Sequence, residues 1–167
     1  GVYRSDDNGE SWTNYTGNYQ SLRINMIGIN TNEIVFAGTN KGVLQTTDYG
    51  ANWITLNEGF DDAFANISTM AVCSLGYIYA ASSGNGLFRS TNNGDYWEVI
   101  PGEISNVIIS CLMATGNNQL FAGTAGSGIY LSTDNGISWA SKNRGLTDLN
   151  VNAILKIANG DLFIGTG

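Results

Sequence analysis

Short apolar runs alternate with turns rich in glycine and asparagine along the whole chain of 167 residues. One set of runs lies at 24–29, 67–72, 107–112 and 151–157, and a second set follows it at 34–39, 77–82, 119–124 and 161–166. Gly and Asn supply the positive φ angles that tight turns need, so this pattern predicts many short strands. No stretch predicts a long amphipathic helix, and no apolar run approaches the roughly 20 residues of a membrane span. The pattern therefore indicates an all-β protein.

The runs belong to a fourfold internal repeat. Segments 1–12, 42–53, 86–97 and 128–139 align without gaps, and their first residues are Gly1, Gly42, Gly86 and Gly128. All four tryptophans of the chain occupy the last position of this segment. Each period contains three β-patterned runs and a further segment that starts at the tryptophan. Four strands in a period of about 42 residues is the size of one propeller blade.

Each aligned segment carries the motif Ser/Thr-x-Asp-x-Gly-x-x-Trp. The four copies are Ser5, Asp7, Gly9 and Trp12; Thr46, Asp48, Gly50 and Trp53; Ser90, Asn92, Gly94 and Trp97; and Ser132, Asp134, Gly136 and Trp139. The motif resembles the Asp-box, or BNR, repeat of sialidase-like, xyloglucanase-type, sortilin-type and photosystem-assembly propellers, and the resemblance covers the whole chain. It implies a β-propeller made of four-stranded antiparallel blades, with four Asp-box repeats in this chain.

The residue types of the motif have a structural logic. A short Asp or Asn side chain accepts hydrogen bonds from the amides of its own turn, and the Gly supplies a left-handed conformation. The tryptophan covers the turn and buries roughly 150–250 Å² between blades. A calcium loop is the functional alternative, suggested by residues 5–9. A calcium loop needs more oxygen ligands than this turn offers, so we expect the turns to be structural. We expect neither a metal ion nor a cofactor.

The resemblance also places the motif between the third and the outermost strand of a blade. We therefore expect residues 1–167 to form a single propeller domain or half-propeller, with repeats of approximately 1–41, 42–85, 86–127 and 128–167. The N- and C-terminal segments then complete one shared blade. Three assemblies stay open: a closed four-bladed ring, an eight-bladed ring made by a homodimer, and a four-repeat piece of a longer array.

Charge and composition narrow the choice of partners. The chain has 14 acidic and 7 basic residues, a net charge of −7, and no histidine. An acidic surface disfavours nucleic acid and anionic membrane surfaces as partners, and no segment predicts membrane insertion. The two cysteines, Cys73 and Cys111, lie in apolar runs and do not predict a disulfide framework or a metal site. Because the chain opens inside a repeat, we expect that any targeting segment has been removed or lies upstream in a longer parent, and we expect an extracellular or cell-surface location.

The active-site residues of the enzymes with this repeat can be compared with this sequence one by one. A sialidase-like site needs three arginines that converge on a carboxylate, but the chain has only Arg4, Arg23, Arg89 and Arg144. Arg4 and Arg89 share one repeat position, and the Arg-Ile-Pro motif of sialidases is absent. A xyloglucanase-like site needs two facing carboxylates, for which the loops offer Asp61, Asp62 and Asp148. We expect the chain not to be an enzyme.

Binding is the better hypothesis. Loops from the fourth strand of one blade to the first strand of the next gather at one face, and their aromatic and polar residues suit carbohydrate or protein surfaces. The candidate ligand face consists of Tyr15, Tyr19, Phe60, Asp61, Asp62, Phe64, Arg144 and Asp148. In the alternative interpretation, these aromatic residues simply cap the blade ends. A ring of Asn25, Ser68, Ser110 and Asn152, equivalent by repeat position, is predicted to polarise the central channel.

These observations predict a non-catalytic, secreted or surface-exposed β-propeller that serves as a binding or scaffolding module for carbohydrate or protein. The alternative is a fragment of an Asp-box glycoside hydrolase, either sialidase-like or xyloglucanase-like. A carboxylate pair facing a cleft favours the hydrolase, whereas a shallow aromatic surface favours the binding module.

Overall fold

The computed structural model describes residues 1–60, 65–116 and 118–167. Its secondary structure is almost entirely β, apart from two short 3₁₀ turns, η1 (Gly17–Tyr19) and η2 (Glu103–Asn106). The strands are β1 (Tyr3–Arg4), β2 (Thr13–Asn14), β3 (Ile24–Ile29), β4 (Val35–Thr39), β5 (Gly42–Thr46), β6 (Ile54–Thr55), β7 (Ile67–Val72), β8 (Ile78–Ser82), β9 (Gly86–Ser90), β10 (Glu98–Ile100), β11 (Ile109–Ala114), β12 (Leu120–Thr124), β13 (Gly128–Ser132), β14 (Ala140–Ser141), β15 (Val151–Lys156) and β16 (Leu162–Thr166). No helix in the described ranges is long and apolar enough to cross a bilayer.

Three four-stranded antiparallel sheets make up the middle of the chain, and we call each of them a blade. Their strand orders are β3-β4-β5-β6, β7-β8-β9-β10 and β11-β12-β13-β14, so neighbours in sequence are neighbours in the sheet. Two-stranded sheets flank them, β1-β2 at the N-terminus and β15-β16 at the C-terminus. We call these two sheets the N-terminal and C-terminal half-blades. The predicted four-stranded antiparallel blades are thus confirmed.

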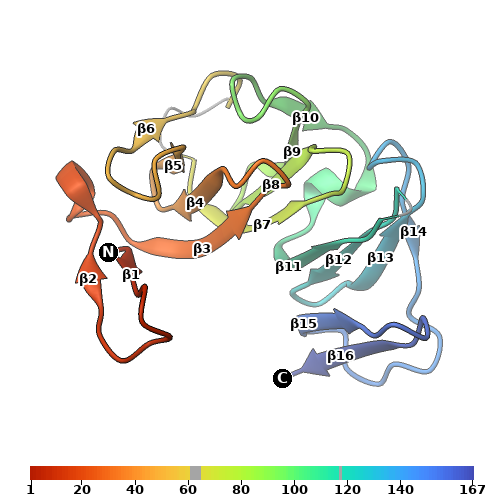
Figure 1. Ribbon diagram of the computed structural model, residues 1–167. Helices are drawn as coiled ribbons and strands as arrows, with labels where there is room; N and C mark the ends of the chain where they lie inside the picture. Colours follow the sequence, from red (N-terminus) through yellow and green to blue (C-terminus); the bar gives the residue numbers. More distant parts are fainter. Residues whose placement is uncertain (61–64, 117) are drawn as a thin grey trace.

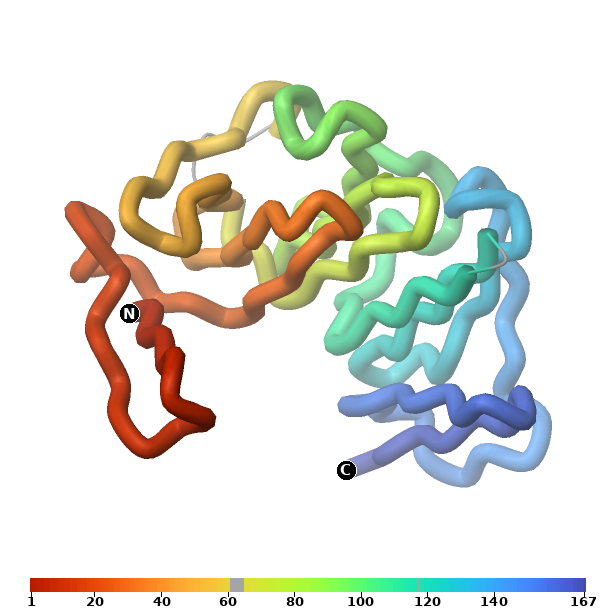
Figure 2. The backbone as a smooth tube through the Cα atoms, in the orientation of Figure 1, coloured from red at the N-terminus to blue at the C-terminus, as the bar shows by residue number. Residues whose placement is uncertain are grey.

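The blades follow one another around an open arc (Figure 1). Their first strands contact each other in the order β3, β7, β11 and β15 along the concave side. The short fourth strands β6, β10 and β14 lie on the outside. The two half-blades stand at opposite ends of the arc, and the two chain termini lie on either side of its opening (Figure 2). Within the single chain the half-blades form separate sheets. The shared blade therefore stays a prediction.

The strand boundaries agree with the sequence pattern to within two residues. The runs at 24–29 and 67–72 coincide with β3 and β7. The run predicted at 107–112 begins only at Ile109, because η2 occupies the preceding residues and Val107 is the extended residue that leaves it. A 3₁₀ turn of four residues has no hydrophobic period long enough to reveal it.

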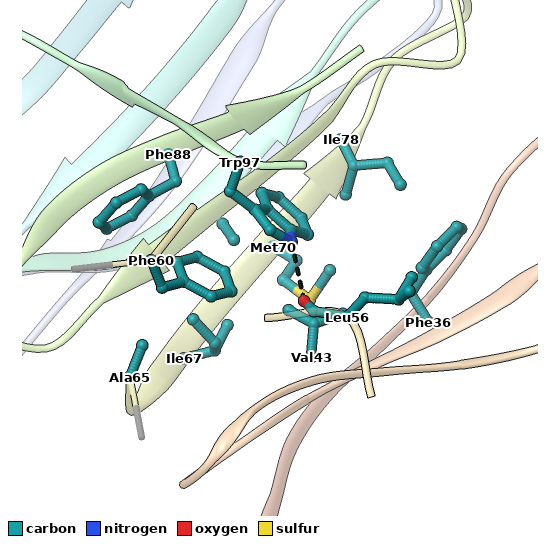
Figure 3. Packing of buried hydrophobic residues seen from close by; sticks show 11 residues of the cluster. Phe36, Val43, Leu56, Phe60, Ala65, Ile67, Met70, Ile78, Phe88 and Trp97 are labelled. Atoms are coloured by element: carbon teal, nitrogen blue, oxygen red, sulfur yellow. Dashed lines mark hydrogen bonds between the residues drawn. The ribbon is translucent and has the colours of Figure 1, made fainter. Parts of the chain in front are cut away.

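The hydrophobic core lies between blades rather than inside any one of them. Phe36 of β4 and Met70 of β7 come from adjacent blades and share one buried cluster with Phe88 and Trp97 (Figure 3). Gly38 in β4 is required by this packing, since a Cβ there would lie 2.8 Å from the Ile67 side chain. Apolar side chains are thus buried when two blades meet, which links the stability of each blade to its neighbours.

A β-bulge follows the first residue of each innermost strand. The pairing register skips one residue in β3, β7, β11 and β15. The skipped residues are Asn25, Ser68, Ser110 and Asn152. A bulge redirects the side chain of the extra residue, and here the redirected position is the polar one that recurs in every repeat.

Candidate binding surface

The Asp-box is a closed network of hydrogen bonds within one turn. In the second copy, the Thr46 hydroxyl donates to Asp48 Oδ1 at 2.8 Å and accepts from the amide of Gly50 at 2.9 Å. The same carboxylate oxygen accepts from the amide of Asn52 at 2.8 Å. The other three copies repeat these three bonds with distances of 2.6 to 3.0 Å. The motif therefore ties the end of a third strand to the start of a fourth.

Two consecutive left-handed residues form the tip of each box. Gly50 has φ of 94°, and Tyr49 before it has φ of 58°. The corresponding residue in the other copies is asparagine, at positions 8, 93 and 135, each with φ of 59°. Asparagine tolerates this conformation well, whereas a bulky residue such as Tyr49 does not. The motif predicts the left-handed conformation for the glycine alone, and the structure adds the residue before it.

The box carboxylates are held in the ionised form by their turns. The Ser11 hydroxyl lowers the pKa of Asp7, and the Asn52 amide lowers that of Asp48. Chiefly through the Ser138 hydroxyl, the pKa of Asp134 falls to about 2. All of these partners lie inside the same turn, which supports the structural interpretation. Among the described residues, no group of three or more Cys, Asp or Glu side chains is arranged to hold a metal ion.

Two of the four boxes also bond to the sheet that precedes them. The indole nitrogen of Trp53 donates to the main-chain oxygen of Tyr15 at 2.7 Å, and that of Trp97 donates to the oxygen of Leu56 at 2.9 Å. Trp139 instead bonds to Gly136 in its own turn. Trp12, which has no preceding blade in this chain, is 62 % exposed, whereas Trp97 is fully buried.

The third strand supplies a second contact between blades. Its polar side chain donates to the carbonyl of the left-handed residue in the next box. The pairs are Arg4 with Tyr49 at 3.2 Å, Gln45 with Asn93 at 3.0 Å, and Arg89 with Asn135 at 3.3 Å. Two of the four arginines thus hold neighbouring blades together and do not converge on one ligand position.

Some residues of the candidate ligand face pack against neighbouring blades, and others are exposed. Tyr15 accepts the Trp53 hydrogen bond through its main chain and lies under the Arg4 guanidinium, 4.9 Å from the ring centre. Tyr19 is half-buried, and its hydroxyl lies 3.5 Å from the main-chain oxygen of Trp53. Phe60 is buried and stacks on Trp97, with the ring centres 5.0 Å apart (Figure 3). These three aromatic residues pack against neighbouring blades.

The remaining members of that face are polar or fall outside the described residues. Arg144 is exposed, and Asp148 accepts two hydrogen bonds from Asn150 in a local turn. Asp61, Asp62 and Phe64 lie outside the described residues.

An open polar cleft lies where a loop from one blade meets the box of the next. It has a volume of about 680 Å³ and is lined by residues 55–60 and by Asp95. Glu58 and Asp95 present exposed carboxylates to it. The loop is anchored, because the Glu58 carbonyl accepts the Trp97 amide at 2.9 Å and Asn57 accepts the Val43 amide. The cleft is therefore acidic, and the loop that lines it is held in place by main-chain hydrogen bonds.

The same junction recurs one blade earlier. A cleft of about 270 Å³ is lined there by residues 17–19 of one loop and 51–53 of the following box. The sequence predicts the loop residues of these clefts but not the contribution of the box. The box contributes the variable position after its glycine, which is Glu10, Ala51, Asp95 or Ile137 in the four repeats, and this variability is the signal that could have identified it.

Comparison with known proteins decides the architecture. An ancestral GH74 enzyme superposes with a TM-score of 0.71 over 98% of this chain and 24% of its own, at 22% identity. YCF48 bound to D1 peptide gives 0.69 over 87% of this chain and 47% of its own, at 16% identity. PorZ, a bacterial surface component of the type-IX secretion system of Porphyromonas gingivalis, gives 0.68 over 86% and 25%, at 19% identity. The chain has a β-propeller fold.

The propeller spans about a quarter of the GH74 enzyme and of PorZ and about half of YCF48. No protein-family model matches the sequence, and comparison with curated protein sequences gives no match. At these identities the likeness concerns the fold alone. The structural neighbours include an enzyme, a peptide-bound protein and a cell-surface component, so the activity of this propeller has to be argued from its own residues.

Proposed function

We propose that this propeller is a non-catalytic binding and scaffolding module located outside the cell or on its surface. The acidic cleft between residues 55–60 and Asp95 is the main support for the proposal, because it offers an open space of about 680 Å³ lined by polar groups on an anchored loop. Its ligand is a protein segment that carries a basic side chain. Carbohydrate is the second ligand class, since carboxylates also accept hydrogen bonds from sugar hydroxyls.

Charge favours the protein ligand. The chain has a net charge of −7, and Glu58 and Asp95 both line the cleft, so a lysine or arginine side chain bound there is attracted by acidic groups. Such exposed pairs steer a charged ligand and contribute modestly to its affinity. YCF48, a structural neighbour, is solved with a bound peptide, and PorZ is a surface component. Both observations support the class of function and the location proposed here.

A glycoside hydrolase is the competing function, favoured by the carboxylate pair in the cleft and by the GH74 neighbour. A glycosidase acid/base pair needs one carboxyl group whose pKa is raised by burial. Glu58 and Asp95 are both exposed, so neither lies in the apolar surroundings of such a buried acid. We therefore propose binding without hydrolysis.

We further propose that two copies form one eight-bladed ring. The open arc leaves a half-blade at each end, and head-to-tail contacts close into a ring when the rotation allows. Each copy then brings its own cleft, so the ring presents two equivalent sites.

Isothermal titration calorimetry at low salt tests the ligand class. The probes are a peptide of alternating lysine and leucine, its glutamate-leucine counterpart, and a xyloglucan oligosaccharide. We expect saturable binding of the lysine peptide alone, weakened about twofold to fivefold by Glu58→Gln and by Asp95→Asn. Glu10→Gln is the matched control, because Glu10 is exposed at the same box position as Asp95 but lies outside this cleft.

Two results overturn the proposal. Release of reducing sugar from xyloglucan, lost in Glu58→Gln, would establish the hydrolase instead. Lysine-peptide binding that is equally weak in wild type, Asp95→Asn and Glu10→Gln would show that the cleft is not the site.

A further inference from the structure

The third Asp-box closes differently from the other three. In those copies a short polar side chain, four residues after the box aspartate, donates a hydrogen bond to the second carboxylate oxygen, Oδ2. The pairs are Ser11 with Asp7 at 2.5 Å, Asn52 with Asp48 at 2.7 Å, and Ser138 with Asp134 at 2.5 Å. The third box has Asn92 and Tyr96 at these positions. Among the described residues, only the main-chain bond between them is kept, in which the Tyr96 amide donates to Asn92 Oδ1 at 3.0 Å.

The two substitutions in the third box match each other chemically. Where aspartate has a second oxygen that accepts a hydrogen bond, asparagine has an NH₂ group, which only donates. The residue at position 96 has therefore lost the acceptor that the closing side chain uses in the other boxes. Its place is taken by a tyrosine that is 51 % exposed. The third box thus gives up a hydrogen bond and shows an aromatic ring to solvent.

The third box also carries its carboxylate at a different position. In the second and fourth boxes the single carboxylate is the box aspartate, which is bonded inside its own turn, and Ala51 or Ile137 follows the glycine. In the third box the single carboxylate is Asp95, which follows the glycine and is exposed. Within the described residues, the Asp95 side chain makes no hydrogen bond or ion pair. A carboxylate that is internal to the turn is thus replaced by one that is free to meet a ligand.

Hydrogen bonds hold this segment against the loop of the acidic cleft. The Asp95 amide donates to the Asn92 carbonyl at 3.3 Å, and the Trp97 amide donates to the Glu58 carbonyl at 2.9 Å. Tyr96 lies between these two residues in the chain, and Asp95 and Glu58 both line the cleft. The main chain of Tyr96 is therefore fixed beside the cleft. No stacking or cation–π contact within the described ranges involves its ring.

Carboxylates beside an exposed aromatic ring suit a guanidinium group better than an ammonium group. A guanidinium group is planar, forms paired hydrogen bonds with a carboxylate and stacks on aromatic faces, whereas an ammonium group is a strongly hydrated point charge. The protein itself contains both kinds of contact. Arg4 lies over the Tyr15 ring, 4.9 Å from its centre, and Arg89 pairs with Glu98 at 3.0 Å.

We propose that the protein segment bound by the acidic cleft presents an arginine, whose guanidinium group pairs with the Asp95 carboxylate and stacks on the Tyr96 ring. Glu58 adds negative charge from the loop. Tyr96 is then the residue that selects arginine over lysine. This inference rests on the proposed function, because it takes the cleft as the binding site for a basic segment, and it adds which basic side chain the site prefers.

Two peptides measure the preference by isothermal titration calorimetry at low salt. One alternates arginine with leucine, and the other alternates lysine with leucine. We expect wild type to bind the arginine peptide about twofold to fivefold more tightly, the usual contribution of an exposed cation–π contact. Tyr96→Ser should bring the ratio of the two affinities to about one, whereas Tyr96→Phe keeps the ring and should keep the ratio. Ile137→Ser is the control outside the site, since Ile137 is exposed at the position of Asp95 in the fourth box.

A rebuilt box tests whether Tyr96 is needed for folding instead. Asn92→Asp combined with Tyr96→Ser gives the third box the closing pair that Asp134 and Ser138 form in the fourth. We expect this double variant to melt at or above the wild-type temperature and to bind the two peptides equally. A lower melting temperature would show that Tyr96 stabilises the blade, and it would overturn the inference.

The remaining outcomes separate this inference from the proposed function. Equal affinity of wild type for the two peptides, with Glu58→Gln still weakening the lysine peptide, would overturn the arginine preference and leave the proposed function standing. A preference that persists in Tyr96→Ser would overturn the role of Tyr96. If neither peptide binds to wild type, the proposed function fails together with the inference.

Discussion

The indole nitrogen of Trp97 donates a hydrogen bond of 2.9 Å to the main-chain oxygen of Leu56 in the preceding blade, and both residues are buried (Figure 3). One residue of an Asp-box thus satisfies a carbonyl of another repeat while its ring stacks on Phe60. The Asp-box therefore joins neighbouring blades in addition to closing its own turn.

Replacing Trp97 by phenylalanine removes that donor and leaves the Leu56 carbonyl buried without its partner. We expect the free energy of unfolding to fall by about 2–4 kcal/mol, combining the unsatisfied carbonyl with the smaller ring. Urea denaturation followed by circular dichroism measures the loss. Tyr96→Phe, at the exposed neighbouring residue, is the control and should leave the stability unchanged.

Tyr49 occupies a left-handed position that asparagine fills in the other three boxes. We expect Tyr49→Asn to preserve or slightly raise the melting temperature, because asparagine adopts this conformation with less strain. Tyr49→Val should lower the stability by about 1–3 kcal/mol, since a β-branched residue is poorly tolerated there. Equal melting temperatures for the two variants would contradict the backbone argument.

The lowered pKa of Asp134 predicts a specific acid response. The pKa of Asp134 in the folded protein is about 2, against 3.8 for an unperturbed group. The ionised carboxylate therefore contributes its full stabilisation above pH 4. That contribution is lost as the pH falls from about 4 towards 2, because the proton removes the charge that the Ser138 and Ser132 hydroxyls stabilise.

Asp134→Asn keeps an acceptor, as Asn92 does naturally in the third box, but cannot titrate. We expect this variant to be less stable than wild type at pH 7 and to lose less stability between pH 4 and pH 2. Thermal melts across that range provide the measurement. Parallel curves for the two proteins would show that the box carboxylate does not set the acid response.

Ser68 joins two innermost strands through the carbonyl of Ile109. Ser68→Ala should cost about 0.5–1.5 kcal/mol of stability, the usual net value of one hydrogen bond. Asn152→Ala is the comparison, because Asn152 has no such partner among the residues that the structure describes. It should leave the monomer unaffected and weaken only the assembled ring, which denaturation at low and high protein concentration distinguishes.

Much of this architecture can be predicted from the sequence because the box is a local structure. Ser, Asp and Gly at fixed spacing close a turn by themselves, and four copies fix the period of the blades. The 3₁₀ turn at Glu103–Asn106 and the left-handed Tyr49 escaped prediction, since neither carries a periodic or compositional signal.

The candidate site could be predicted only in part, because its members come from different repeats. Glu58 and Asp95 meet in one cleft only after two blades have packed together. The same packing places Phe60 on Trp97 rather than on an exposed face. The exposure of Trp12 and Phe163 likewise depends on which neighbouring blade is present, and a motif alone does not contain that information.

Size-exclusion chromatography with light scattering tests the central claim, that two copies of this chain complete one ring. One chain has a mass of 17.8 kDa. The account predicts a single species of twice that mass that persists on dilution, and a shift towards the monomer in Trp12→Ala. A monomer of 17.8 kDa at every concentration would contradict it.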